Sequence, residues 1–398
     1  MADKLTPQQQ MAVASRGGKL LVSAAAGSGK TKVLVDRLLG FLTQEHDSAN
    51  LDEFLIITYT KAAASELRGK IAAKLTEEIA RQPENRHLQR QMQRLFLTKI
   101  STVHGFCSDL LREYAYKLDV AADFRVADEN ECREIRETVL EGLLDRAYET
   151  AGDDPDFRAF VDTQGVGRSD RQVPELVEKV YDSAHCHLNP EAWLDKCLTD
   201  AEAEGIGDAG ETVWGQYLIR DFREYLDCQM AVLRQCAESA DSCPGLEKPA
   251  VTLRDALYQL EQLRACTTWD DIAAKRELRF GTLRFPTKNN PDPELTERIK
   301  DAWSACKDGL RKKLVGFSND SGQVLTDLHQ TAAAQRGLVA LVRQFDRDYS
   351  AAKRSRRVLD FGDLEHKTLD LLLGKSRSQP TAAAREIGRR YREIMVDE

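Results

Sequence analysis

The segment Lys19–Thr31 reads KLLVSAAAGSGKT and carries the strongest structural signal in the chain. Its first five residues form a short apolar run, and we expect Lys19–Ser23 to be a buried strand. The next eight residues match a phosphate-binding loop of the GxxxxGK[ST] type, with Ala24 in place of the first glycine. Apolar residues then recur at helical spacing from Thr31 onward. A strand, a glycine-containing loop and a helix in this order predict a nucleotide-binding site.

Each residue type in this loop has a physical role toward a bound triphosphate. Gly27 and Gly29 let the backbone approach closely, and N–H groups at a helix start attract anions. Lys30 would reach the β- and γ-phosphates of ATP, and the Thr31 hydroxyl would ligate Mg²⁺. The residues expected to hold the nucleotide are Ala24, Ala25, Ala26, Gly27, Ser28, Gly29, Lys30, Thr31 and Lys32.

The last five residues supply the acidic partner of such a loop. The apolar run Ile394–Val396 predicts a strand, and it is followed by Asp397 and Glu398. Asp397 would hold Mg²⁺, directly or through water, and Glu398 would activate the attacking water as a general base. Lys30 and these two carboxylates are therefore the predicted catalytic residues. Because the chain stops directly after them, we expect it to be a truncated piece of a longer protein.

The remaining patterns predict an α/β domain that is interrupted by a helical insertion. Three further short apolar runs alternate with helical patterns, as in a parallel sheet, and predict strands at Phe54–Thr58, Ile100–Val103 and Phe124–Ala127. Beyond them the patterns are mostly helical, and the α/β texture returns near the end. The predicted parts are the α/β domain at 1–128, the insertion at 129–336 and the second part of the α/β domain at 337–398.

Composition narrows the class of protein. The chain has 398 residues with 42% hydrophobic and 31% charged side chains, which excludes fibrous and wholly disordered proteins. Its net charge is −8, so any nucleic-acid site must be local rather than a global basic field. The polar start lacks the pattern of a signal peptide, and the nine cysteines include no CxxC pair. We expect a soluble cytoplasmic protein that does not associate with membranes.

Several segments resemble the motifs of superfamily 1 DNA helicases of the UvrD, Rep, RecB and AddA types. AAAGSGKT matches their variant of motif I, in which alanine replaces the first glycine. Leu5–Gln9 (LTPQQ) resembles the glutamine motif upstream of that loop, and Thr58–Leu67 (TYTKAAASEL) resembles motif Ia. Ser101–Cys107 (STVHGFC) resembles the motif TxHSFC. Asp397 and Glu398 resemble the beginning of motif II.

This resemblance implies further site residues. Gln9 would hydrogen-bond the adenine edge, although from the residue alone we would favour a polar residue at a helix start. The implied single-stranded DNA contacts are Tyr59, Thr60, Lys61, Thr102 and His104. The family usually has Phe at the position of Tyr59, where a ring can stack on a base, and Asn at that of Lys61. From the residues alone, Tyr59 could instead be a core residue and His104 a structural histidine.

Within this superfamily the chain is most similar to the AddA (RexA) components of AddAB-type helicase–nucleases, through 124–131 (FRVADENE), 176–194 and 359–372. The resemblance implies a RecA-like P-loop NTPase domain with a parallel sheet, interrupted by a largely helical subdomain. It also implies ATP and Mg²⁺, single-stranded DNA and duplex ends, and a heterodimer partner of the AddB (RexB) type. Such proteins unwind and process double-strand DNA ends for recombinational repair, with a nuclease domain that would lie outside this chain. Two alternatives stay open: a UvrD/Rep-type repair helicase without a nuclease, and a P-loop module that binds DNA or a partner without hydrolysis.

Charged segments near the end permit more than one interpretation. The segment 342–357 carries six basic and two acidic residues, and could be a solvated helix face or could follow duplex phosphates. The segment 275–288 offers a second basic patch. Asp360, Asp363 and Glu365 could suggest a metal-dependent nuclease site, but we favour capping of a helix start and packing.

Overall fold

The computed structural model describes residues 5–43, 48–164, 172–286 and 290–397. They form a mixed α/β protein with a short parallel sheet and a large share of helix. The chain divides into two compact units, Met1–Leu140 with Arg347–Glu398, and Glu141–Asp346. None of the helices in the described part of the chain is long and apolar enough to cross a membrane.

The first unit contains a three-stranded parallel sheet. In the order in which they lie side by side, its strands are β2 (Lys99–Thr102), β1 (Phe54–Thr58) and β5 (Glu393–Asp397). The central strand β1 is buried along its whole length. The register aligns Thr58 with Thr102 on one side and with Asp397 on the other. The carboxyl ends of all three strands therefore meet in one row, which is where open α/β sheets bind ligands.

One expected strand is absent and another is shortened. The prediction for Phe54–Thr58 is confirmed, but the prediction that Lys19–Ser23 is a buried strand is wrong: it has no strand structure, and Leu21 is 92% exposed. A strand needs a hydrogen-bonding neighbour, and among the described strands β1 is already paired on both edges. The expected strand Phe124–Ala127 is reduced to β3 (Arg125–Val126), which pairs with β4 (Val358–Leu359) in a separate sheet.

Helices pack around the sheet of the first unit, directly or through one another. They are α1 (Pro7–Ala14), α2 (Lys30–Leu42), α3 (Lys61–Arg81), α4 (Arg86–Arg94), α5 (Val103–Glu113), α15 (Phe361–Leu373) and α16 (Ala382–Gly388), with a 3-10 turn η2 at Ala115–Lys117. The apolar faces of α2 and α3 pack on β1, where Leu38, Ile56 and Ile71 are all fully buried. Burial of these side chains sets the position of the loop that leads into α2.

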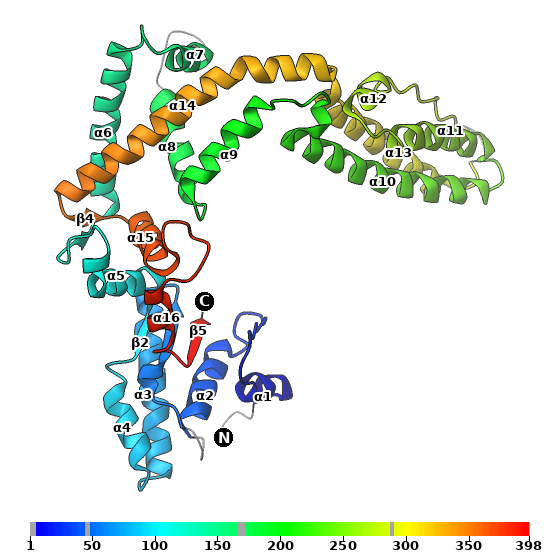
Figure 1. Cartoon of the computed structure of the whole chain (residues 1–398). Coiled ribbons are helices and arrows are strands. Elements are labelled where there is room, and N and C mark those ends of the chain that lie inside the picture. The colour runs from blue at the N-terminus through cyan, green and yellow to red at the C-terminus, as the bar shows by residue number, and fades with distance from the viewer. Residues whose placement is uncertain (1–4, 44–47, 165–171, 287–289, 398) are drawn as a thin grey trace. The chain divides into compact units, whose positions relative to one another are not determined.

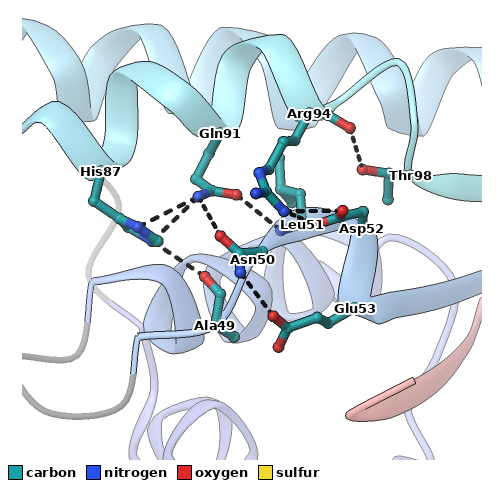
Figure 2. Close-up of polar contacts among 9 residues, drawn as sticks. All are labelled: Ala49, Asn50, Leu51, Asp52, Glu53, His87, Gln91, Arg94 and Thr98. Carbon is teal, nitrogen blue, oxygen red and sulfur yellow. Dashed lines mark hydrogen bonds and ion pairs between the residues drawn. The ribbon is translucent and has the colours of Figure 1, made fainter. Parts of the chain in front are cut away.

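A polar network fixes the segment that enters β1 through the turn η1 (Leu51–Glu53), as Figure 2 shows. Gln91 of α4 is wholly buried; its Oε1 accepts from the Leu51 N–H at 2.9 Å and its Nε2 donates to Asn50 Oδ1 at 3.0 Å. Arg94 donates to both carboxylate oxygens of Asp52, at 2.8 and 2.9 Å. A buried amide is costly unless it is hydrogen-bonded, so these bonds select one position of α4 against the start of β1.

The second unit is helical. Two helices run from the first unit into it, α6 (Glu129–Glu149) and α14 (Ser321–Ser355). Its other elements are α7 (Pro155–Gln164), α8 (Gln172–His185), α9 (Pro190–Glu202), η3 (Ala209–Glu211), α10 (Val213–Asp241), α11 (Glu247–Arg264), α12 (Trp269–Ala274), α13 (Pro293–Leu314) and η4 (Val315–Phe317). Figure 1 shows α10, α11 and α13 packed side by side. Their shared core includes the fully buried Leu226, Leu253 and Ile299.

Candidate nucleotide and DNA site

The glycine-containing loop leads directly into α2. Gly27 and Gly29 have φ values of 77° and 86°, in the left-handed region that glycine adopts without a steric penalty. Gly29 is the N-terminal cap of α2, and no side chain caps the first turn. The start of α2 therefore offers backbone donors and the positive end of the helix dipole to an anion. This geometry fits the phosphate-binding loop expected from the sequence.

The Lys30 side chain folds back over this loop. Its Nζ donates to the carbonyl oxygen of Ala24 at 3.1 Å and to that of Ala25 at 3.4 Å. A phosphate would compete well for this ammonium group, because it adds attraction between opposite charges that a neutral carbonyl oxygen cannot offer. Lys30 thus lies where the phosphates of a nucleotide would enter.

The two expected magnesium ligands meet. Thr31 at the start of α2 donates through Oγ1 to Oδ2 of Asp397 at 3.2 Å, although 366 positions separate them in the sequence. Asp397 is the last residue of β5, which lies beside α2 (Figure 1). Hydroxyl and carboxylate oxygens are the hard ligands that Mg²⁺ prefers. Glu398, the predicted general base, lies outside the described residues.

Gln9 reaches the same loop from α1. The Thr6 side chain and the Gln9 side chain form a capping box at the start of this helix, in which Gln9 Oε1 accepts from the Thr6 N–H at 2.9 Å. The Gln9 Nε2 donates to the carbonyl oxygen of Ser28 at 3.0 Å. Gln9 is therefore both the helix-start residue that its position suggests and a direct neighbour of the phosphate loop.

A cavity of about 610 Å³ borders the loop. Its walls include four lysines, of which Lys30 and Lys32 come from α2 and Lys70 and Lys74 from α3. Lys70 pairs with Glu66 at 2.6 Å and Lys74 with Glu77 at 2.9 Å, which reduces the positive charge that these two side chains offer to a polyphosphate. The sequence did not predict that Lys70 and Lys74 lie at this cavity, because two lysines four positions apart on a helix are typical of a solvated face.

The first group of expected DNA contacts follows β1. Tyr59 is 87% exposed, so it is not a core residue, and its ring is free of the sheet's interior. Thr60 caps α3, because its Oγ1 accepts from the Ala63 N–H at 3.0 Å. Lys61 is exposed in the first turn of the same helix. The structure thus places an aromatic ring and a positive charge at the carboxyl end of the central strand.

The second group of expected DNA contacts, Thr102 and His104, lies at the carboxyl end of β2 and in the first turn of α5. Thr102 caps α5 by accepting from the Gly105 N–H at 3.1 Å. The Nε2 of His104 lies 2.9 Å from Oε1 of Glu365, and its ring centroid is 4.6 Å from that of Phe361. Phe361 is 59% exposed and was missed in the sequence, since only the fold brings it beside His104.

Asp360 and Asp363 cap a helix start, as expected, whereas Glu365 lies against His104. Asp360 caps α15 and forms a capping box with Asp363. The Lys353 Nζ lies 2.8 Å from Asp360 Oδ2 and 2.6 Å from Asp363 Oδ2, and Lys353 is only 2% exposed. Burial opposes ionisation of Asp360, but the Lys353 ammonium outweighs it and lowers the pKa of that carboxyl. Lys353 already pairs with both carboxyl groups, which disfavours a metal site there.

The basic helix around 342–357 has little unpaired positive charge. It forms the end of α14 and the turn that follows, where Arg343 pairs with Glu191 and Asp195. Other members are held by carboxylates too: Lys353 as described, Arg354 by Asp119 and Arg357 by Asp123. Paired guanidinium groups attract phosphates less than free ones. This pairing favours a solvated helix face over a segment that follows duplex phosphates. The second basic patch, 275–288, extends beyond the described residues.

Comparison with known proteins identifies the family of the chain. The model of the UvrD/REP helicase N-terminal domain matches residues 5–398. Curated relatives named as the A-type subunit of an ATP-dependent helicase/nuclease include proteins of Geobacillus kaustophilus (33% identity, 99% of this chain and 32% of the relative) and Pelotomaculum thermopropionicum (34% identity, 100% and 32%). The protein of the same name from Moorella thermoacetica is 34% identical over 99% of this chain and 28% of its own length. The chain spans about a third of the length of these relatives. It belongs to the UvrD/REP helicase N-terminal domain family.

Proposed function

We propose that this chain is the ATP-binding part of one component of an ATP-dependent DNA helicase–nuclease. The longer protein would unwind and process double-strand DNA ends for recombinational repair, together with an AddB-type partner. The names of the relatives, which are A-type subunits of ATP-dependent helicase/nucleases, support this assignment. The nuclease and the second motor domain would lie in the part of the relatives that this chain does not cover.

The contact between Thr31 and Asp397 carries the proposal. It joins the phosphate loop to the end of β5 at 3.2 Å. Thr31 and Asp397 would hold Mg²⁺, and the loop from Ala24 to Lys32 would hold the phosphates of ATP. When bound, Mg²⁺ would neutralise charge that develops on the phosphates. Glu398 would take a proton from the attacking water, and Lys30 would stabilise the transferred phosphoryl group.

The DNA site would lie one strand away from the nucleotide. Because Thr58 is aligned with both Thr102 and Asp397, the residues after β1 and β2 share an edge with the residues that would hold Mg²⁺. Tyr59 and Phe361 offer exposed rings for base stacking, an interaction worth about 1–3 kcal/mol per base. Thr60, Lys61, Thr102 and His104 would contact the strand's phosphates and sugars. This proximity would let nucleotide-driven movement act on DNA.

The architecture that we propose is a RecA-like domain interrupted by a helical subdomain. The first compact unit, which is discontinuous in sequence, would be the RecA-like part, and the helical unit Glu141–Asp346 the inserted subdomain. This division lies within about a dozen residues of the sequence-based boundaries at 128 and 336. The insertion would start within α6 and end within α14.

ATP hydrolysis by the full-length protein tests the proposal. We expect hydrolysis to be strongly stimulated by single-stranded or blunt-ended DNA, and Lys30→Ala to reduce it by at least about a hundredfold. Hydrolysis that DNA does not change would contradict the helicase assignment and favour a P-loop binding module. This chain by itself should bind nucleotide weakly and should not separate strands, because half of the nucleotide cleft would come from the part it does not cover.

A further inference from the structure

The helix that carries Gln9 has almost no apolar anchorage. None of the eight residues of α1 is buried, so packing alone does not fix its position. The spacing between α1 and α2 at Gly40 is ordinary, since a Cβ there would lie 4.0 Å from Cγ1 of Val13. Polar contacts must therefore hold Gln9 against the phosphate loop.

Two residues provide those contacts: Arg16, which donates to the carbonyl oxygens of Val13 and Ser15 and lies over the Phe41 ring, and Arg37 of α2, which alone of the two also reaches β5. The Arg37 Nη1 donates to the carbonyl oxygens of Ala12 at 2.7 Å and Ser15 at 2.5 Å, both at the carboxyl end of α1. Arg37 is only 8% exposed, and its sequence context gives no hint of this role. Cations are favoured at the carboxyl end of a helix, where carbonyl groups lack helical partners.

The other side of the same guanidinium holds β5. Its Nε donates to Glu393 Oε1 at 2.6 Å and its Nη2 to Glu393 Oε2 at 3.0 Å. Glu393 is the first residue of the strand that ends at Asp397. Only the planar fork of arginine can make a bidentate pair with a carboxylate while it also donates to two carbonyl groups.

We propose that Arg37 is a positioning residue that sets Gln9 for recognition of the nucleobase by tying the carboxyl end of α1 to Glu393 at the start of β5. This inference rests on the proposed ATP site. It assigns to Arg37 no contact with nucleotide: its effect passes through α1, and phosphate binding by the loop does not depend on it. Arg37→Lys keeps a positive charge next to Glu393 but cannot span all four acceptors.

Comparison of two ligands tests this role. Binding of ATP and of inorganic tripolyphosphate, each with Mg²⁺, is measured by calorimetry on the whole chain, because tripolyphosphate engages the phosphate loop and has no base. We expect Arg37→Lys to weaken the binding of ATP about fivefold to tenfold, which corresponds to the loss of one hydrogen bond. The affinity for tripolyphosphate should stay within about twofold of the wild-type value. Gln9→Ala should have the same effect, and the double variant should lose no more than either single variant.

Arg68→Lys is the matched control. Arg68 is a second guanidinium that donates to backbone carbonyl groups, those of Leu95 (2.5 Å), Thr98 (3.3 Å) and Ile100 (3.4 Å), but it does not touch α1 in these bonds. The Arg68→Lys substitution should lower the thermal midpoint, followed by circular dichroism. It should not change the ratio of the affinities for ATP and tripolyphosphate. If Arg37→Lys unfolds the chain, Glu393→Gln gives the same comparison, since it weakens the bidentate pair while keeping the side-chain shape.

The outcomes separate the two proposals. If Arg37→Lys lowers the affinity for ATP and for tripolyphosphate equally, the positioning role is overturned and the proposed ATP site is not affected. Additive losses of ATP affinity in the double variant would have the same meaning. Wild-type chain that shows not even the weak binding expected of it, for either ligand, would instead overturn the proposed ATP site, and the positioning role with it. If the wild-type chain binds both ligands with equal affinity, Gln9 does not contribute to recognition of the nucleobase, which also overturns the positioning role.

Discussion

At the scale of single residues, Lys353 bears a charge that is almost wholly buried. It is 2% exposed, pairs with Asp360 and Asp363, and lies 4.1 Å from the ring of Tyr349. Lys353→Met would leave two buried carboxylates without their cation. We expect it to lower the free energy of unfolding by about 3–5 kcal/mol, measured by urea denaturation.

Lys196→Met is the control for that change. Lys196 pairs with Asp200 at 2.5 Å, but its side chain is 60% exposed. Its loss should change the free energy of unfolding by less than about 0.5 kcal/mol. Similar effects of the two substitutions would contradict the view that the Lys353 cluster is desolvated.

Cys306 gives a prediction about pH. Burial raises the pKa of this thiol from 9.0 to about 11. The folded state therefore retains its proton more strongly than the unfolded chain does, so its contribution to stability is complete below pH 9 and is lost as the pH rises toward 11. The decline in thermal midpoint between these pH values should be steeper for the wild type than for Cys306→Ala. Parallel declines would mean that this thiol does not contribute.

At the scale of elements, two helical glycines should respond to alanine in opposite directions. A Cβ on Gly215, in the first turn of α10, would lie 1.9 Å from the carbonyl oxygen of Ala209. A Cβ on Gly69, inside α3, would meet no atom within 4 Å. We expect Gly215→Ala to destabilise the chain by about 1–3 kcal/mol or more, and Gly69→Ala to stabilise it by about 0.5–1 kcal/mol. The thermal midpoints of the two variants test this prediction. Midpoints that change in the same direction in both variants would contradict it.

At the scale of the whole molecule, the tryptophans distinguish the two compact units. All four, Trp193, Trp214, Trp269 and Trp303, lie in the unit Glu141–Asp346. Tryptophan fluorescence therefore reports unfolding of the helical unit alone, whereas the proposed nucleotide site belongs to the other unit.

Nucleotide should therefore stabilise the chain unevenly. At 100 times the dissociation constant, ATP with Mg²⁺ should add about 2.7 kcal/mol to the unit that binds it. We expect the amide exchange of β1 and α2 to slow accordingly, while the transition followed by tryptophan fluorescence moves less. An equal shift of both signals would mean that the units unfold as one.

The sequence by itself determined the elements whose signals are local. The strand Phe54–Thr58 is buried on every side, and a continuous apolar run of this length encodes that directly. The cap at Asp360 and the glycines of the phosphate loop follow from residue type and spacing, because capping and left-handed backbone are properties of neighbouring residues. The resemblance in the motifs identified the family, which the comparisons confirm.

Tertiary structure alone decided which distant groups meet. The run Lys19–Ser23 has the apolar character of a strand, but a strand forms only beside a partner, and the pairing of β1 with β2 and β5 is set by the fold. The contacts of Arg37 with Glu393, and of His104 with Phe361, join residues more than 250 positions apart. Local patterns carry no information about such pairs, because burial and hydrogen bonding across the sheet select them only once the chain has folded.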